Sequence, residues 1–204
     1  MSTRGRYRNG LESRRRILIG AAQSFGRRGF AGATLRQIAA EVGVAHGSLV
    51  QHFGSKDELL LAVLRLWDED LTDSLPELHG VAFLRGLGDL VRGHAERRPY
   101  IELFLTISVE ASDPSHPAHD YIRARATRVR ERVVAELKVA ASSGDVLTSD
   151  EYELECAARE LLALMNGLEM QWLLDPDVDL GGIFQPYLNQ WLYRLGPMST
   201  SPAS

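Results

Sequence analysis

Hydrophobic and polar positions between residues 34 and 59 follow the spacing of two short helices joined by a tight turn. Thr34 stands before the first helix as an N-cap, and Gly43 follows it, where a left-handed turn favours glycine. The apolar face of the first helix consists of Leu35, Ile38, Ala39 and Val42. The apolar face of the second helix consists of Val44, Leu49 and Phe53. This pattern predicts a helix-turn-helix, whose second helix fits the major groove of DNA.

Basic residues gather in the segment that contains this pattern. Residues 1–58 hold ten Arg and Lys against four Asp and Glu, whereas residues 59–204 hold 13 bases and 23 acids. The formal net charge of −4 therefore combines a basic N-terminal segment with an acidic body. Because phosphate binding depends on the local field, this asymmetry favours nucleic acid as a partner of the N-terminal segment alone.

The N-terminal segment resembles the DNA-binding domain of the TetR family of bacterial one-component regulators. The resemblance rests on three stretches. The first stretch, Ala22–Phe30, ends a helix with an aromatic residue and glycines. The second stretch, Thr34–Val44, has the pattern Thr-x-x-x-Ile-Ala-x-x-x-Gly-Val. The third stretch is Leu49–Leu59. Two positions depart from the family pattern. Val50 replaces a tyrosine that touches the DNA backbone, and Ala45 replaces a serine cap, so we expect one phosphate contact fewer.

The resemblance implies roles for individual side chains of the helix pair. Base edges would be contacted by Arg36, His46, Ser48 and Gln51. DNA phosphates would be contacted by Thr34, His52 and Lys56, of which the first and last stand where helices begin and backbone N–H groups attract anions.

The rest of the chain predicts an all-α protein. Apolar stripes interrupted by proline, glycine and acidic turns predict helices over residues 56–75, 81–97, 100–111, 119–142, 149–174 and 180–195. We expect an N-terminal three-helix bundle with the helix-turn-helix and a larger C-terminal helical domain for ligand binding and dimerisation. The expected boundaries are a flexible basic arm over 1–10, the DNA-binding domain over 11–55, the larger domain over 56–196 and a disordered tail over 197–204.

The last two predicted helices carry more large apolar residues than a terminal hairpin can bury, which favours a homodimer. The expected interface residues are Leu164, Leu168, Trp172, Tyr187 and Trp191, with closure of the monomer core as the alternative. The two DNA-binding domains of a homodimer would recognise a near-palindromic operator. The resemblance also implies a pocket for a small organic inducer. Its candidate lining is Phe83, Leu87, Phe104, Ile107, Ser108, Tyr121, Met165, Asn166, Glu169 and Met170.

A helical metal-dependent enzyme and a protein-interaction adaptor are the alternative functions. Metal-compatible groups occur close together at Asp113, His116, His119 and Asp120, but the prolines between them favour an interhelical loop. The sequence holds no Glu-x-x-His pair, phosphate-binding glycine loop or G-x-S-x-G motif. We therefore expect no catalytic residues, metal or cofactor. A protein-interaction adaptor would not need the basic N-terminal segment.

Three smaller expectations concern location, the cysteine and one histidine. No apolar run approaches the roughly 20 residues of a membrane span, and no signal peptide is evident, so we expect a cytoplasmic bacterial protein that joins the nucleoid when bound to DNA. The single cysteine, Cys156, excludes an intramolecular disulfide, and we expect it in the core. We expect His94, beside Arg92 and Glu96, at the surface.

Together, the helix-turn-helix pattern, the basic N-terminal segment and the family resemblance predict a ligand-responsive transcriptional repressor.

Overall fold

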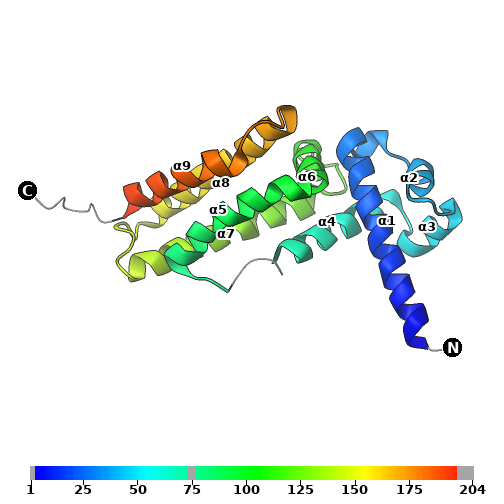
Figure 1. The fold of residues 1–204 in the computed structure, drawn as a ribbon, viewed down its shortest axis with the longest axis horizontal. Helices are drawn as coiled ribbons and strands as arrows, with labels where there is room; N and C mark the ends of the chain where they lie inside the picture. The colour runs from blue at the N-terminus through cyan, green and yellow to red at the C-terminus, as the bar shows by residue number, and fades with distance from the viewer. Residues whose placement is uncertain (1–2, 73–76, 197–204) are drawn as a thin grey trace, which may run out of the picture. The chain divides into compact units, whose positions relative to one another are not determined.

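The computed structural model describes residues 3–72 and 77–196, which form nine α-helices, one short 3₁₀ helix and no strand (Figure 1). The prediction of an all-α fold is confirmed. The described residues form two compact units, 3–72 with 98–123, and 77–97 with 124–196. The predicted tail and the last residues of the helix expected over 56–75 lie outside the described residues.

The first unit contains the helix-turn-helix and the helices that support it. Its helices are α1 (Thr3–Gly32), α2 (Leu35–Val42), α3 (His46–Phe53), α4 (Lys56–Thr72), α6 (Arg98–Glu110) and the first residues of α7 (His119–Ser142). Residues 3–10, expected as a flexible arm, continue α1 as helix. Each residue added to an existing helix gains one backbone hydrogen bond, which favours this extension.

The core of the first unit joins α1 to α6 as well as to α2, α3 and α4. Phe25 on α1 is fully buried, as are Leu103 and Ile107 on α6. The hydroxyl of Thr106 on α6 donates a hydrogen bond to the carbonyl oxygen of Gly26 at 3.2 Å. The support of the helix-turn-helix therefore extends past the expected boundary at residue 55, because α4 and α6 complete its core.

Helix α1 changes direction at Gly29, which has φ 70° and ψ 175°. The backbone N–H of Phe30, just after this kink, donates a hydrogen bond to Glu110 Oε2 at 2.7 Å. The predicted end of the first helix near this glycine corresponds to the kink, after which helical structure continues to Gly32. Only a glycine takes this backbone conformation at low cost.

The second unit contains α5 (Gly80–Gly93), the 3₁₀ helix η1 (His94–Arg97), most of α7, α8 (Glu151–Leu174) and α9 (Leu180–Leu195). Glu136 on α7 is buried and accepts a hydrogen bond from the backbone N–H of Gly80 at 2.6 Å, which fixes the start of α5. Helices α5 and α9 approach closely at Gly88, where a side chain would collide with the Gln185 amide. The predicted bounds of α7 and α9 agree with the structure.

Candidate nucleic-acid interface

Helix α2 begins with a complete capping box. The backbone N–H of Gln37 donates to Thr34 Oγ1 at 3.3 Å, and the backbone N–H of Thr34 donates to Gln37 Oε1 at 3.1 Å. The N-cap predicted at Thr34 is thus confirmed, and Gln37 is its unpredicted partner. The Thr34 hydroxyl also donates to Gln37 Oε1 at 2.8 Å, so a phosphate would compete with an internal contact. The phosphate role of Thr34 stays a prediction.

The turn between α2 and α3 has the geometry that the sequence predicts. Gly43 has φ 71° and ψ 37°, in the left-handed region. The N–H of Val44 donates to the Ala39 carbonyl oxygen at 2.9 Å, which closes the end of α2. Ala45 precedes α3 and provides no side-chain cap, as expected from the missing serine. The orientation of α3 instead depends on its buried residues, Leu49 and Phe53.

The candidate base-contacting side chains lie on the outer side of this helix pair. Arg36, His46 and Gln51 are exposed, and Ser48 is half-buried. In the described part of the chain, Arg36, His46 and Gln51 have no hydrogen-bond or ionic partner. Their polar groups are thus available to a ligand, while the helices that carry them are held by caps and core. Their contacts with bases stay predictions.

Lys56, a candidate phosphate contact, is partly engaged within the protein. Its ammonium donates hydrogen bonds to the carbonyl oxygens of Phe30 at 2.9 Å and Ala33 at 3.1 Å. It also lies 4.1 Å from the centre of the Phe30 ring, a cation–π geometry. One of the three ammonium donors is left for a phosphate. The sequence pattern showed only the position of Lys56 at the start of α4 and missed its role in holding the end of α1.

Two arginines beside α3 were missed by the sequence analysis. Arg14 on α1 lies 4.8 Å from the centre of the Phe53 ring, and Arg65 stands on α4. Together with His52 they line a cleft of about 290 Å³, which also includes Phe53, Glu58, Leu61 and Ala62. All three basic side chains are exposed. The family motif gave no signal for Arg14 and Arg65, because they lie on either side of it in sequence and meet only in the fold.

Another arginine of the first unit is neutralised within the protein. Arg28 on α1 donates a hydrogen bond to Glu41 on α2, and this bond holds the pKa of the Glu41 carboxyl below its ordinary value. The carboxylate therefore stays ionised at neutral pH and offsets the charge of Arg28. The positive field next to α3 consequently depends more on Arg14 and Arg65 than on Arg28.

The candidate inducer-pocket residues divide between the two compact units. Phe104, Ile107, Ser108 and Tyr121 belong to the first, whereas Phe83, Leu87, Met165, Asn166, Glu169 and Met170 belong to the second. Phe83, Leu87, Ile107 and Glu169 are buried. Asn166 and Met170 are exposed, so the structure does not place these two in the interior of a protomer. The pocket as a whole stays a prediction.

The expectation that His94 lies at the surface was wrong. Its side chain is 5% exposed and its Nδ1–H donates to Glu169 Oε1 at 2.6 Å, while Glu169 is 3% exposed. Nε2 of His94 is buried and has no hydrogen-bond partner in the described structure. The charged neighbours Arg92 and Glu96 suggested a solvated stretch, but the hydrogen bond to Glu169 on α8 holds His94 in the interior.

Three of the five expected dimer-interface residues are buried within one protomer. Leu168, Trp172 and Trp191 belong to the core, where they have little surface left for a partner. Leu164 and Tyr187 are half-buried, and the Tyr187 hydroxyl donates to Glu160 Oε1 at 2.9 Å. The structure thus favours core closure for the three buried residues, the alternative considered above. The large hydrophobic residues that are exposed on α8 and α9 are Tyr152, Met170, Leu174, Ile183 and Tyr193.

Two further details concern cysteine and histidine chemistry. Cys156 is exposed, which corrects its expected place in the core. His116 lies in the predicted loop between α6 and α7, and His119 is the first residue of α7. His119 Nδ1–H donates to the Ala111 carbonyl oxygen at 2.8 Å. Within residues 3–72 and 77–196, no three His, Cys, Asp or Glu side chains gather in an arrangement that would hold a metal ion.

Comparison with known proteins connects this arrangement to bacterial regulators. Residues 17–63 match the family model described as "Bacterial regulatory proteins, tetR family". A relative from Pseudomonas putida, "Probable HTH-type transcriptional regulator ArpR", is 30% identical over 200 residues, which cover 91% of this chain and 93% of the relative. The "HTH-type transcriptional repressor AcnR" of Corynebacterium efficiens is 31% identical over 125 residues, 59% of this chain. That match spans 64% of the relative, less than two thirds of its length.

Solved structures show the same fold. A TetR transcriptional regulator from Chloroflexus aurantiacus J-10-FL has a TM-score of 0.75 at 24% identity, with 92% of this chain and 97% of that chain covered. The structure described as "SmeT-Triclosan complex" has a TM-score of 0.72 at 21% identity, with 95% and 96% covered. Among the described helices of this chain, none is both long and apolar enough to cross a membrane.

Proposed function

Because the chain belongs to the TetR family of bacterial regulatory proteins, we propose that it is a homodimeric repressor that a small molecule releases from a near-palindromic operator. It is a DNA-binding regulator of transcription rather than an enzyme, as its relatives are. The finer proposal concerns how it reads DNA, how it pairs and how it responds to a ligand. We also propose that the protein acts at the chromosome, in the bacterial cytoplasm.

The observation that carries the DNA-reading proposal is the set of unengaged polar side chains on a rigid helix pair. Arg36, His46 and Gln51 are exposed and free of protein partners in the described structure, while Leu49 and Phe53 hold α3 in the core. Arginine pairs with guanine and glutamine with adenine in the major groove. We assign base contacts to Arg36, His46, Ser48 and Gln51.

Phosphate contacts set the register of α3 on DNA without reading its sequence. We assign them to Thr34, His52 and Lys56, as expected from the family, and add Arg14 and Arg65 from the same face. These two arginines compensate for the tyrosine that the family has where this chain has Val50. Stacking of Arg14 on Phe53 lowers the entropy that its guanidinium would lose on binding.

Homodimer formation is supported by an unpartnered face of α8. Ala163, Gly167, Met170 and Leu174 recur at intervals of three and four residues, so they share one side of the helix. Met170 is 55% and Leu174 82% exposed, and Ile183 on α9 is 47% exposed. Exposure of large apolar side chains in one area typically marks an interface. A dimer also presents two recognition helices to two half-sites.

Ligand release follows from linkage. Some small molecules would bind better to the form of the dimer in which the two recognition helices are poorly spaced for DNA. Such a molecule lowers the affinity of the protein for DNA, and bound DNA lowers the affinity of the protein for the molecule by the same factor. The structural neighbour SmeT is described in complex with triclosan, which supports a small organic ligand for this chain too. Most of the buried candidates for its pocket lie in the second unit.

Selection of genomic DNA fragments on the purified full-length protein, followed by sequencing, tests the proposal. We expect recovery of one near-palindromic sequence at moderate salt. Retention of random fragments alone would contradict sequence-specific repression, because nonspecific binding is carried by phosphates. A second step adds small organic molecules to the complex with the recovered operator. Persistence of the complex throughout a broad set would contradict ligand release.

A further inference from the structure

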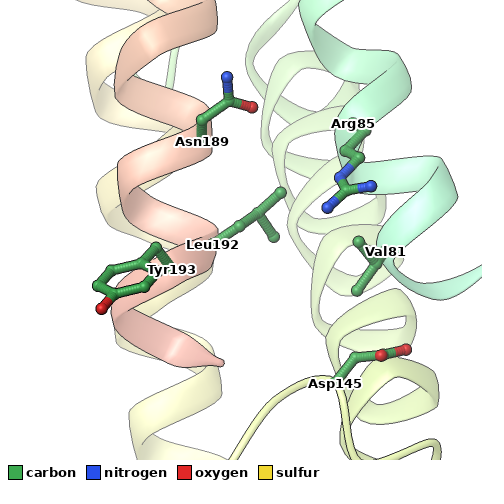
Figure 2. Close-up of a pocket in the computed structure, with 6 residues that line it drawn as sticks. All are labelled: Val81, Arg85, Asp145, Asn189, Leu192 and Tyr193. Carbon is green, nitrogen blue, oxygen red and sulfur yellow. The ribbon is translucent and has the colours of Figure 1, made fainter. Parts of the chain in front are cut away.

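A cleft between α5 and α9 belongs to none of the surfaces assigned above. Its volume is about 310 Å³, at the lower end of the range for small-molecule sites. Val81 and Arg85 come from α5, Asn189, Leu192 and Tyr193 from α9, and Asp145 from the segment after α7 (Figure 2). All six residues lie in the second compact unit, so the cleft is complete within it.

Two opposite charges share this cleft without neutralising each other. Neither Arg85 nor Asp145 forms a side-chain hydrogen bond or ion pair with any residue in the described part of the chain. Two other pairs of exposed charges in the same unit do neutralise each other. Arg92 lies 2.6 Å from Asp89, and Lys138 lies 2.7 Å from Glu151. The cleft therefore offers both a cation and an anion to a ligand.

The space between the charges is lined by apolar and amide groups. Figure 2 shows Leu192 projecting from α9 toward α5, with Val81 and the Arg85 guanidinium on the opposite wall. Val81 and Leu192 are half-buried. Asn189 lies one turn before Tyr193 on the α9 wall. Its amide oxygen accepts a hydrogen bond from Gln185 Nε2 at 3.3 Å, so its NH₂ group is left to donate to a ligand. A ligand that fits must therefore combine charged groups with a small apolar part.

The walls of the cleft are fixed by contacts outside it. Glu136 holds the start of α5 through the Gly80 N–H at 2.6 Å. The backbone N–H of Leu147 donates to the Leu195 carbonyl oxygen at 2.8 Å, which ties the segment after Asp145 to the end of α9. The cleft is thus formed before a ligand arrives, and binding requires little ordering of the protein.

We propose that this cleft binds a small zwitterion. Its carboxylate pairs with Arg85 and Asn189, its ammonium with Asp145, and its apolar part covers Val81 and Leu192. An anionic ligand is attracted by Arg85 but repelled by Asp145. A cationic ligand is attracted by Asp145 but repelled by Arg85. A zwitterion satisfies both charges, and aliphatic amino acids have this chemistry. The proposal does not depend on the DNA-binding assignments.

The test is a titration of the full-length protein, observed at the methyl signals of Val81 and Leu192 by NMR. The probes are two zwitterions, leucine and 6-aminohexanoate, which differ in the distance between their charges. Leucinamide lacks the carboxylate, and 4-methylpentanoate lacks the ammonium. We expect saturable shifts with at least one zwitterion and, for the other two probes, affinities lower by about tenfold or more. Saturation by neither zwitterion, or equal affinities for all probes, would overturn the proposal.

Variants identify the two charges. Arg85→Gln should weaken zwitterion binding by about tenfold and bring leucine and leucinamide to equal affinity. Asp145→Asn should weaken it similarly and bring leucine and 4-methylpentanoate to equal affinity. Arg92→Gln, on the same helix but outside the cleft, is the matched control and should bind as the unaltered protein does. Unchanged discrimination in Arg85→Gln or Asp145→Asn would refute the assignment of that charge.

Discussion

The ammonium of Lys56 donates a hydrogen bond to the carbonyl oxygen of Phe30 at 2.9 Å and lies 4.1 Å from the centre of the Phe30 ring. The first residue of α4 is thereby attached to the segment that follows the kink in α1. The same ammonium has a proposed second role at the DNA backbone. Lys56 therefore stabilises the fold of the first unit and, in the proposed function, also binds DNA phosphate.

Lys56→Met removes the hydrogen bonds of the ammonium and keeps most of its apolar stem. We expect the free energy of unfolding to fall by about 1–3 kcal/mol, because two carbonyl oxygens lose a charged donor. Urea unfolding measures this loss. We also expect weaker binding to operator and random DNA by a similar factor. Unchanged stability would show that the contacts with Phe30 and Ala33 contribute little.

Arg14→Ala tests the unpredicted phosphate contact beside α3. We expect a weaker salt dependence of DNA binding, with the slope of log K against log salt reduced by about one. The loss of affinity should be similar on operator and random DNA. Arg16→Ala is the control, since Arg16 is also exposed on α1 but does not line the cleft. Equal slopes for Arg14→Ala and the unaltered protein would exclude Arg14 as a phosphate contact.

Leu174→Glu tests the assigned dimer face. Leu174 is 82% exposed in the protomer, so a carboxylate there leaves the fold intact but makes burial against a second copy costly. We expect a shift from dimer to monomer in sedimentation equilibrium and a weakening of operator binding. Val109→Glu, a similar change at a 75% exposed position on α6, should remain dimeric. A dimeric Leu174→Glu protein would place the interface elsewhere.

The His94–Glu169 pair predicts a strongly non-additive double-mutant cycle. His94→Leu leaves the Glu169 carboxyl group buried without its hydrogen-bond partner, which should lower the free energy of unfolding by about 1–3 kcal/mol. The double variant with Glu169→Leu should recover much of this loss, because no buried polar group is then left without a partner. Urea denaturation of the four proteins measures the coupling. Additive losses would show that the two side chains act independently.

Local patterns predicted the elements of the fold because they depend on neighbours in sequence. The caps at Thr34 and Gly43 and the apolar spacing of α2 and α3 are properties of short segments, and the structure contains each of them. The family resemblance added roles for individual side chains of this helix pair, which stay predictions. In contrast, the stacking of Arg14 on Phe53 joins residues that are distant in sequence, and no periodicity indicates it.

The errors of the sequence analysis arose where one face of a helix had to be assigned to a particular neighbour. Trp172 and Trp191 are large and regularly spaced, but spacing alone does not distinguish a core face from an interface, and both are buried in the protomer. His94 was assigned to the surface from its charged neighbours, whereas a buried carboxylate 75 positions away determines its place. These assignments required the tertiary structure.

The central claim, that side chains on α3 read base sequence, is tested most directly by the affinity of Gln51→Ala. Binding is measured at one salt concentration on the selected operator, on single-base variants of it and on random DNA. We predict a loss of about 1–3 kcal/mol on the operator, relaxed preference at one base pair and unchanged affinity for random DNA. Equal losses on operator and random DNA would contradict the claim, because Gln51 would then contribute no sequence information.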